Sequence, residues 1–293
     1  MTFYRGVSIR IEKYQAGKYH HLGPMRQILN FFLRPILNRA PQKFRPMVRR
    51  SHVSAGEVIE KATTHEALEV LYKKGVTKSK EKFFSKMMRR IWFGMDNALG
   101  IYNRLVLVKK KFAFFAAQPH AVRILSIASG SARAIIDSLD WLKLKKKEVE
   151  ISFLDKNPRA LDHGRFLVSQ EKNSNIHFRF LNDTASNFVN YFESDQKLDI
   201  IEMVGLLDYF EDAKIKELLS LIHNRLSNDG VLITANIADN RERPFVTNLI
   251  GWKMIYRKPE EMINMAIAAG FRERKMEIIF EPTMIHFILI AQK

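Results

Sequence analysis

The sequence predicts an α/β protein in which a basic, mainly helical N-terminal region precedes a largely parallel sheet that ends in an antiparallel hairpin. Two patterns predict the sheet. From residue 121 onward, short β-rich runs alternate with helical patterns of about 15 to 25 residues, which is typical of βαβ units. The last two extended runs are joined through Pro282 and Thr283, which favours a terminal hairpin.

The charge distribution divides the chain at the same place. Residues 1–120 contain 24 Lys and Arg but only 7 Asp and Glu, whereas residues 121–293 contain 24 of each sign. The whole net charge of +17 therefore belongs to the first part. We expect two parts with different roles, a basic cap or substrate region over 1–120 and a ligand-binding domain over 121–293.

The composition excludes several classes of protein. A chain of 293 residues that is 46% hydrophobic can bury a sizeable core. The sequence has no cysteine, which excludes disulfides, thiolate nucleophiles, iron–sulfur clusters and cysteine-ligated zinc, and a cytoplasmic location is expected. His20 and His21 have no further ligand at metal-binding spacing, so no metal is predicted. No apolar run is long enough to span a bilayer and residues 1–10 lack a signal-like apolar stretch, so we expect a soluble protein.

Four segments are expected in the N-terminal region. Apolar residues at helical spacing predict a helix over 26–39, which Pro35 should end or kink. Further prolines among basic residues predict a loop-like linker through Arg50. Helical patterns then cover 54–72 and 78–111, with a break in the second near a glycine, Gly94 or Gly100.

The elements of the second part follow in order. Strands are predicted at 122–127, 149–154, 176–181, 198–204 and 230–236, with the hairpin strands at 275–280 and 285–291. Helices are predicted at 131–144, 158–172, 187–192, 213–226, 244–252 and 259–269, the last of them ended by Gly270.

Two features at the ends of the first two of these strands predict a ligand. The first strand runs into the small-residue turn 126–132, which contains Gly130, and then into a helix. Such a turn lets a ligand approach the backbone and the amides of a helix N-terminus. The second strand ends at Asp155, a carboxylate that can accept both hydroxyl protons of a ribose. Together they favour a nucleoside-type ligand over a plain turn and a helix cap.

At these residues the sequence resembles the class I S-adenosylmethionine-dependent methyltransferases. The resemblance covers about residues 121–293 and rests on Ile124-Leu-Ser-Ile-Ala-Ser-Gly130, on Phe153-Leu-Asp155 and on the strand pattern. It implies a Rossmann-like seven-stranded methyltransferase sheet with a terminal antiparallel hairpin. In the broad family the first motif begins with an acidic residue, where this chain has Ser126, and has glycine where this chain has Ala128 and Ala132.

A narrower resemblance concerns the acceptor. The strings Leu125-Ser-Ile-Ala-Ser-Gly130, Gly205-Leu-Leu-Asp-Tyr-Phe-Glu-Asp212 and Trp252-Lys-Met-Ile-Tyr-Arg257 resemble a bacterial branch that includes enzymes making 3-hydroxy fatty acid methyl ester quorum signals. The resemblance extends upstream to Trp92-Phe-Gly-Met-Asp-Asn97 and Asn103-Arg-Leu105, which would make the helical region part of the enzyme.

The resemblance implies a set of cofactor contacts, residue by residue. The methionine and ribose moieties would lie over the first turn, Asp155 would hold the ribose, two residues after the third strand would contact adenine, and the end of the fourth strand would line the path to the methyl group. These positions are Ser126, Ala128, Gly130, Asp155, Asn182, Asp183, Met203 and Gly205.

The acceptor site follows from the chemistry of methyl transfer. The reaction is an in-line displacement, so the protein mainly aligns the reacting atoms and excludes water. A carboxylic acid is already ionised at neutral pH and needs a positioning cation instead of a base. Arg257 is the first candidate because a guanidinium can hold a carboxylate through two hydrogen bonds, and Arg104 is a further one. Tyr209 and Tyr256 are candidate hydrogen-bond donors.

Three functions remain open. The first is methylation of a small acidic or lipidic acceptor, with the apolar and basic residues of 26–39 touching an acyl chain or an anionic membrane surface. The second is an RNA methyltransferase whose basic region binds along the phosphates. Against it, no RNA-binding module is recognisable, and Gly-Leu-Leu-Asp follows the fourth strand in place of the Asn/Asp-Pro-Pro-Tyr string of many base amino-methylating enzymes. The third is a protein that binds the cofactor without catalysis.

Overall fold

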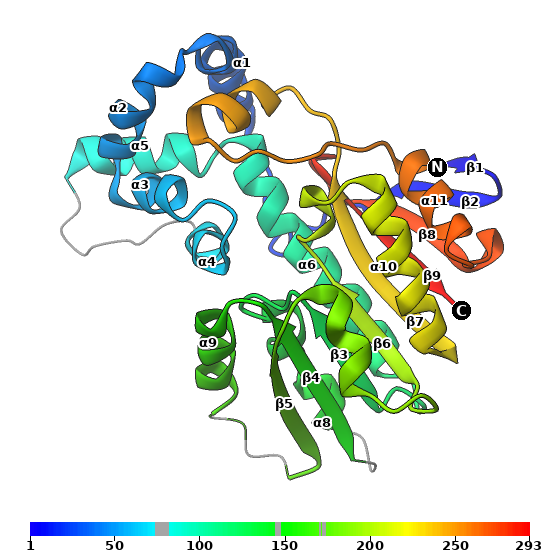
Figure 1. Ribbon diagram of the computed structural model, residues 1–293. Coiled ribbons are helices and arrows are strands. Elements are labelled where there is room, and N and C mark those ends of the chain that lie inside the picture. Colours follow the sequence, from blue (N-terminus) through cyan, green and yellow to red (C-terminus); the bar gives the residue numbers. More distant parts are fainter. Residues whose placement is uncertain (74–81, 144–147, 170, 172–173) are drawn as a thin grey trace.

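The computed structural model describes residues 1–73, 82–143, 148–169, 171 and 174–293, and its centre is one mixed nine-stranded sheet (Figure 1). The strand order is β1-β2-β8-β9-β7-β6-β3-β4-β5. In chain order the strands are β1 (Thr2–Tyr4), β2 (Val7–Ile11), β3 (Arg123–Ile127), β4 (Val149–Asp155), β5 (Ile176–Asn182), β6 (Leu198–Met203), β7 (Leu226–Ile237), β8 (Met276–Phe280) and β9 (His286–Gln292).

The prediction of seven strands was wrong, because the first residues of the chain add a hairpin to the sheet. Strands β3 to β7 pair in parallel, and β9 pairs antiparallel with both β7 and β8. Strand β2 then pairs in parallel with β8, with Ser8 opposite Glu277. Val7 is fully buried in the core, which holds β2 at this edge. The N-terminal region therefore contributes strands as well as helices.

Helices cover both faces of the sheet. They are α1 (Pro24–Arg39), α2 (Arg45–Ser51), α3 (Val53–Glu60), α4 (His65–Tyr72), α5 (Phe83–Trp92), α6 (Asp96–Ala116), α7 (Arg133–Ile136), α8 (Asp140–Lys143), α9 (Pro158–Val168), α10 (Asp212–Arg225) and α11 (Pro259–Ala268). Shorter helical turns are η1 (Gln42–Phe44), η2 (Ala185–Tyr191), η3 (Leu207–Tyr209), the π-helical η4 (Phe245–Ile250) and η5 (Glu273–Lys275). Within the described parts of the chain, none of the helices has both the length and the apolar composition that crossing a bilayer requires.

Three apolar clusters hold these layers together. One lies between the sheet and α10, α11 and η2, and the second lies between the other face and α6 and α7. The third cluster joins α2, α3 and α4 to η4, and includes Val58, Leu71, Phe93, Phe245 and Trp252. In Figure 1 these N-terminal helices and η4 stand together over the sheet edge where the central parallel strands end. That edge is where open α/β sheets bind ligands.

Several N-terminal expectations are corrected. Helix α1 continues through Pro35, whose exposed position lets water replace the lost backbone bond. Helix α2 begins at Arg45 where a linker was expected, with Pro46 in its first turn, where proline is tolerated. The long helix breaks between Trp92 and Asp96, at Gly94, where a Cβ would lie 2.5 Å from the Arg26 guanidinium and 2.7 Å from the Arg90 carbonyl oxygen. Gly100 instead sits inside α6, where a Cβ would lie 2.8 Å from Ile285.

The second part follows the predicted elements with small shifts of their ends. The helix expected over 131–144 is two short helices, α7 and α8, and the one expected over 158–172 ends at Val168. Asn157 caps α9 by accepting a bond from the Arg159 amide, and Pro158 occupies its first turn. The parts of predictions that fall at 78–81, 144, 170 and 172 lie outside the described residues.

Candidate active site

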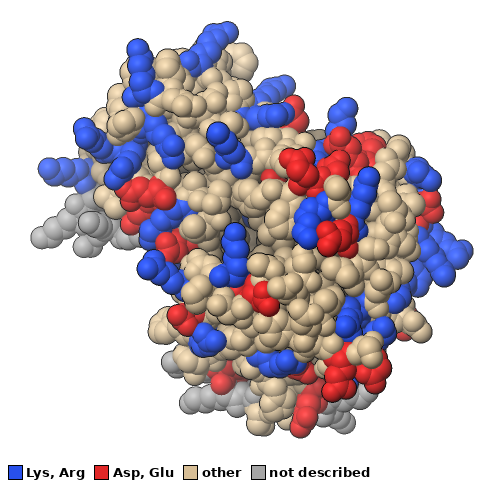
Figure 2. All heavy atoms as spheres, viewed as in Figure 1, with Lys and Arg blue, Asp and Glu red and all other residues tan. Residues whose placement is uncertain are grey.

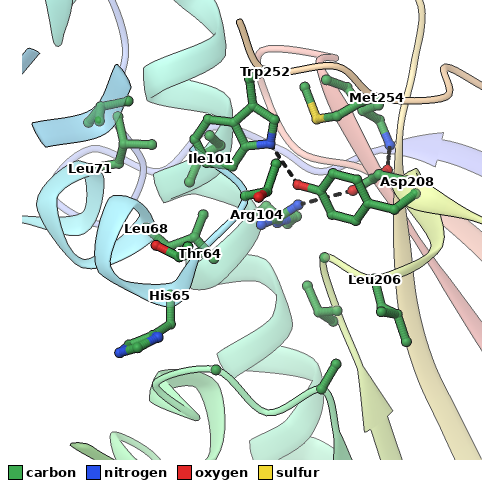
Figure 3. Close-up of a pocket in the computed structure, with 18 of the residues that line it drawn as sticks. Thr64, His65, Leu68, Leu71, Ile101, Arg104, Leu206, Asp208, Trp252 and Met254 are labelled. Carbon is green, nitrogen blue, oxygen red and sulfur yellow. Dashed lines mark hydrogen bonds and ion pairs between the residues drawn. The ribbon is translucent and has the colours of Figure 1, made fainter. Parts of the chain in front are cut away.

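A cavity of about 720 Å³ lies where the carboxyl ends of β3, β4 and β6 meet the N-terminal helices. Figure 3 shows Thr64, His65 and Leu68 on one side of it and Leu206 and Asp208 on the other, with Arg104 between them and Trp252 above. Helices α3, α4 and α6 and η4 supply the apolar walls, while the turns after the strands supply the polar ones. The cavity is therefore apolar at the N-terminal end and polar at the sheet.

The turn after β3 has the backbone shape that a close ligand approach needs. Ala128, Gly130 and Ala132 all have left-handed backbone, with φ of 52°, 54° and 50°. The Gly130 amide donates a 2.8 Å hydrogen bond to Asp155 at the end of β4, which ties the turn to the neighbouring strand. A Cβ at Gly130 would lie 3.4 Å from the His65 side chain, so α4 sits directly over this turn. Alanine at two of these positions carries a strain that glycine avoids.

Two carboxylates follow β4 and β5 on this edge and line the cavity. Asp155 is 9% exposed and also accepts a 2.8 Å bond from the Asn157 amide. Asp183 accepts bonds from Asn187 and from the Thr184 amide, which hold its pKa below the usual range. Both carboxylates are therefore hydrogen-bond acceptors with defined orientation.

A buried acid lies beneath the β3 turn. Ser126 and Glu202 face each other on neighbouring parallel strands, and the Ser126 hydroxyl donates a 2.5 Å bond to the Glu202 carboxylate. Burial raises the pKa of Glu202 to about 7, although Ser126 and the nearby Arg104 favour its charged form. Neither residue lines the cavity; Glu202 lies two residues before Val204, which does. Glu202 was not predicted from the sequence, although an acid placed between the apolar Ile201 and Met203 of a strand is a signal.

A second buried polar group lies at the middle of the cavity. Arg104 of α6 is 4% exposed, and its guanidinium lies 3.9 Å from the carboxylate of Asp208. The Arg104 Nε atom has no hydrogen-bond partner among the residues that the structure describes. A Cβ on Gly205, whose φ is 86°, would lie 3.7 Å from this guanidinium. Arg104 therefore stands over the end of β6 with a donor to spare.

His286 of β9 is a further polar residue that lines the cavity. It is 2% exposed, and neither ring nitrogen has a partner in the described parts of the chain. Burial, aided by the charge of Arg104, lowers its pKa well below the ordinary value, so the imidazole is neutral. Single scattered histidines give no sequence signal, which is why His286 and His65 were not predicted.

The cavity brings together some predicted residues and leaves others out. Those that line it are Ala128, Gly130, Asp155, Asp183, Gly205, Tyr209 and Arg104. Those that do not are Ser126, Asn182, Met203, Tyr256 and Arg257. Asn182 donates to the Asp155 carbonyl, and the Met203 carbonyl accepts from Thr234 inside the core.

Arg257 does not line the cavity, and its guanidinium is fully hydrogen-bonded to other residues of the protein. It is 3% exposed and donates to the Asp212 carboxylate at 3.0 Å, to the Leu207 carbonyl at 2.9 Å and to Asn236 at 3.2 Å. These bonds brace the loop after β6 and engage the donors that a carboxylate clamp, as predicted from the sequence, would need. Tyr256 lies beneath the Arg243 guanidinium, 4.5 Å from ring centre to cation.

Tyr209 lines the cavity with its hydroxyl already engaged. It accepts a 2.6 Å bond from the Trp252 indole, and burial raises its pKa, so the phenol stays protonated.

An ion pair holds helix α4 over the site. The Glu69 carboxylate of α4 accepts two hydrogen bonds from Arg133 of α7, at 2.9 and 3.0 Å. Burial acts against the charge of Glu69, but Arg133 outweighs it and lowers the pKa. Helix α4 and the β3 turn that it covers are therefore held together by this ion pair.

Comparisons with known proteins agree with this fold. Residues 92–293 match the family described as “Putative methyltransferase”, so the match begins upstream of residue 121, at Trp92. No curated protein matches.

Three solved structures show the fold at low identity. A “possible exported protein” from Bordetella parapertussis is 15% identical with a TM-score of 0.66, over 93% of this chain and 99% of that one. A “putative O-methyltransferase” from Nostoc punctiforme PCC 73102 is 19% identical with a TM-score of 0.50, over 77% and 66% of the two chains. Magnesium protoporphyrin IX methyltransferase from Synechocystis PCC 6803, with bound SAH, is 11% identical with a TM-score of 0.51, over 77% and 92%.

Proposed function

Because the chain belongs to the family described as “Putative methyltransferase”, we propose that it transfers a methyl group from S-adenosylmethionine to a small acceptor with an apolar body and an anionic group. The observation that carries this proposal is one cavity in which the turn at Gly130, the carboxylate of Asp155, the buried Arg104 and an apolar lobe meet. The acceptor that fits this combination best is the carboxylate of a fatty acid, a 3-hydroxy fatty acid included.

The polar end of the cavity suits an adenosyl sulfonium. Each oxygen of Asp155 accepts one backbone amide and keeps a lone pair for a ribose hydroxyl. Asp183 lines the adjoining wall and can accept from the adenine amino group. Ser126 stands where the family pattern has an acid. Glu202 on the neighbouring strand does not line the cavity, but it places a carboxylate beneath the β3 turn, where its charge would favour the methionine ammonium group.

The other end suits an amphiphilic acid. The lobe is lined by Val58, Leu68, Leu71, Trp92, Phe93, Ile101, Phe245 and Trp252, which offer an acyl chain apolar contacts. Arg104 lies between this lobe and the end of β6, where its guanidinium can hold a carboxylate by two hydrogen bonds. An apolar chain seated in the lobe would thus present its head group at Gly205.

The reaction then needs alignment more than proton transfer. When bound, the cofactor supplies an electrophilic methyl group on a positively charged sulfur. Arg104 orients the acceptor carboxylate so that one oxygen forms the new bond to the methyl carbon as the carbon–sulfur bond breaks, with its electron pair passing to sulfur. No proton moves, so no base is required, and His286 is free to hold a neighbouring hydroxyl. The apolar walls exclude water from the displacement.

Calorimetry tests the cofactor half of the proposal. We expect S-adenosylmethionine to bind, and Asp155→Ala to weaken binding by at least about tenfold, because a charge-assisted bond to ribose is lost. Asp162→Ala, on the exposed side of α9, is the matched control and should bind as the wild type does. Equal affinity of the two variants for S-adenosylmethionine would contradict the cofactor site proposed at Asp155.

The acceptor half is tested with methyl-labelled cofactor. We expect label in the methyl esters of medium or long-chain fatty acids and 3-hydroxy acids, and none with the corresponding amides, which lack the ionised oxygen. Label in RNA with none in acids would favour a nucleic-acid methyltransferase. Tight cofactor binding without any labelled product would leave a cofactor-binding protein without catalysis.

A further inference from the structure

Helix α1 packs against the protein with its polar face. The Arg26 guanidinium donates to the carbonyls of Arg90 and Ile91, and the Asn30 amide donates to the Gly94 carbonyl at 2.8 Å. Arg34 forms an ion pair with Asp96 at 2.5 Å. Only Asn30 of this helix is buried. The inward face of α1 is therefore held mainly by hydrogen bonds and charge, and Leu37 adds an apolar contact to the third cluster.

The apolar face of α1 points outward. The exposed fractions of Met25, Ile28, Phe31, Phe32 and Ile36 lie between 61% and 85%. A helix on a globular protein ordinarily buries this stripe and exposes the polar one. Scattered exposed apolar residues need no explanation, but a continuous stripe of large ones marks a surface that contacts something else.

The surroundings of this stripe are basic. Residues 13–56 contain nine Lys and Arg and no Asp or Glu. Helix α5, which α1 contacts, adds Phe83 and Phe84, 85% and 61% exposed, close in sequence to the exposed Lys82 and Lys86. Figure 2 shows Lys and Arg side chains distributed over the N-terminal helices, at the upper left, between patches of uncharged surface.

We propose that α1 and the start of α5 dock on the surface of an anionic lipid bilayer, with the apolar stripe of α1 at the depth of the acyl chains. An amphipathic helix that turns its apolar face to the solvent and is flanked by Lys and Arg has the composition of helices that lie in the membrane interface. A second copy of the chain would bring two basic surfaces together and is opposed by charge. RNA would meet the cations and could stack on Phe31 and Phe32. The aliphatic Met25, Ile28 and Ile36 beside them would stay in water on RNA, whereas they leave water in a bilayer.

The docked helix adjoins the wall of the cavity. Asn38, near the end of α1, donates to the Arg241 carbonyl at 2.7 Å and accepts from the Phe245 amide at 3.2 Å. Phe245 begins η4 and lines the apolar lobe. A membrane amphiphile thus meets the protein one helix away from the acceptor site. The docking proposal stands independently of the proposed reaction, since it needs only the surface.

Vesicle flotation with the full chain tests the proposal. We expect binding to vesicles of phosphatidylcholine mixed with phosphatidylglycerol and much weaker binding to phosphatidylcholine alone. The double variant Ile28→Ser with Phe32→Ser should bind mixed vesicles at least about tenfold more weakly, because two apolar side chains no longer leave water. Phe114→Ser with Phe166→Ser, exposed apolar residues of α6 and α9, is the matched control and should bind as the wild type does.

A charge variant separates the electrostatic part. Lys43→Glu with Arg50→Glu should lower affinity for mixed vesicles by about fivefold or more per residue and leave binding to neutral vesicles unchanged. Thermal unfolding establishes that each variant is folded. Absence of vesicle binding by the folded wild type, equal loss in the control, or a concentration-dependent dimer abolished by the Ile28 and Phe32 changes would each overturn the proposal. RNA binding with no vesicle binding would do the same.

Discussion

The Ser126 hydroxyl donates a 2.5 Å hydrogen bond to the Glu202 carboxylate, and the two residues lie in register on neighbouring parallel strands. Ser126 occupies the position at which the resemblance to class I methyltransferases implies an acid. The carboxylate is thus present beneath the β3 turn, but it comes from β6. Burial raises the pKa of this carboxyl to about 7, so the pair is sensitive to pH near neutrality.

Glu202 should make the stability of the protein fall with rising pH. The folded protein holds this proton up to about pH 7, whereas a glutamate of the unfolded chain loses it near about 4.3. The free energy of unfolding therefore decreases as the pH rises from about 4 to about 7. In Glu202→Gln we expect up to about 3 kcal/mol of this decrease to disappear, as measured by urea unfolding across that range. A variant with the slope of the wild type would contradict the assignment.

Cofactor binding should draw a proton from the same group. A ligand ammonium favours the ionised carboxylate, so S-adenosylmethionine affinity should rise several-fold between about pH 6 and about pH 8. Calorimetry in buffers of different ionisation enthalpy should detect proton release at pH 6 in the wild type and none in Glu202→Gln. Proton release that persists in the variant would assign the linkage to another residue.

Arg104 should act on the acceptor and not on the cofactor. Arg104→Lys keeps the charge but loses the planar fork that can hold a carboxylate. We expect KM for a carboxylate acceptor to rise by at least about tenfold with the Kd of S-adenosylmethionine within about twofold of the wild type. Initial rates and calorimetry measure the two quantities. A larger change in cofactor affinity than in KM would place Arg104 at the methionine end.

Arg257 should matter for stability. Lysine cannot reproduce its bonds to Asp212, Asn236 and two carbonyls, so Arg257→Lys should lower the free energy of unfolding by about 3 kcal/mol. Arg5→Lys, at a solvent-exposed ion pair with Glu273, should change it by less than about 0.5 kcal/mol. Urea unfolding compares the two. A stable Arg257→Lys protein with raised acceptor KM would restore the carboxylate clamp predicted from the sequence.

Glycine should improve the β3 turn. Ala128 has a φ of 52°, a conformation that disfavours a Cβ by about 1–2 kcal/mol. Glycine loses more conformational entropy on folding than alanine, which offsets part of this gain. We therefore expect Ala128→Gly to raise the free energy of unfolding by about 0.5–1 kcal/mol. Ala113→Gly, in the regular helix α6, should lower it by about 1 kcal/mol. Loss of stability in both variants would mean that the turn relaxes without strain.

The elements of the second part could be predicted because each is a local pattern. Alternation of apolar strands with helices located β3 to β7 and the terminal hairpin, and small residues at 128–132 located the turn beside Asp155. The pairing of β2 with β8 had no such signal, because it joins residues almost the whole length of the chain apart. Gly94 and Gly100 were equivalent as candidate helix breakers in the sequence, and only the structure shows that the break lies at Gly94 while Gly100 lies inside α6 against Ile285.

By itself, the sequence determined the order of the elements, the small-residue turn, the carboxylate that follows the next strand and the basic character of the N-terminal region. These depend on residue type and on spacing within a few tens of residues. Only the tertiary structure decided that Arg104 faces the cavity while Arg257 is consumed by the scaffold, that Glu202 stands beside Ser126, and that α1 turns its apolar face outward. Each of these depends on which groups from distant parts of the chain satisfy a buried charge or cover an apolar surface, and spacing along the sequence carries no information about that.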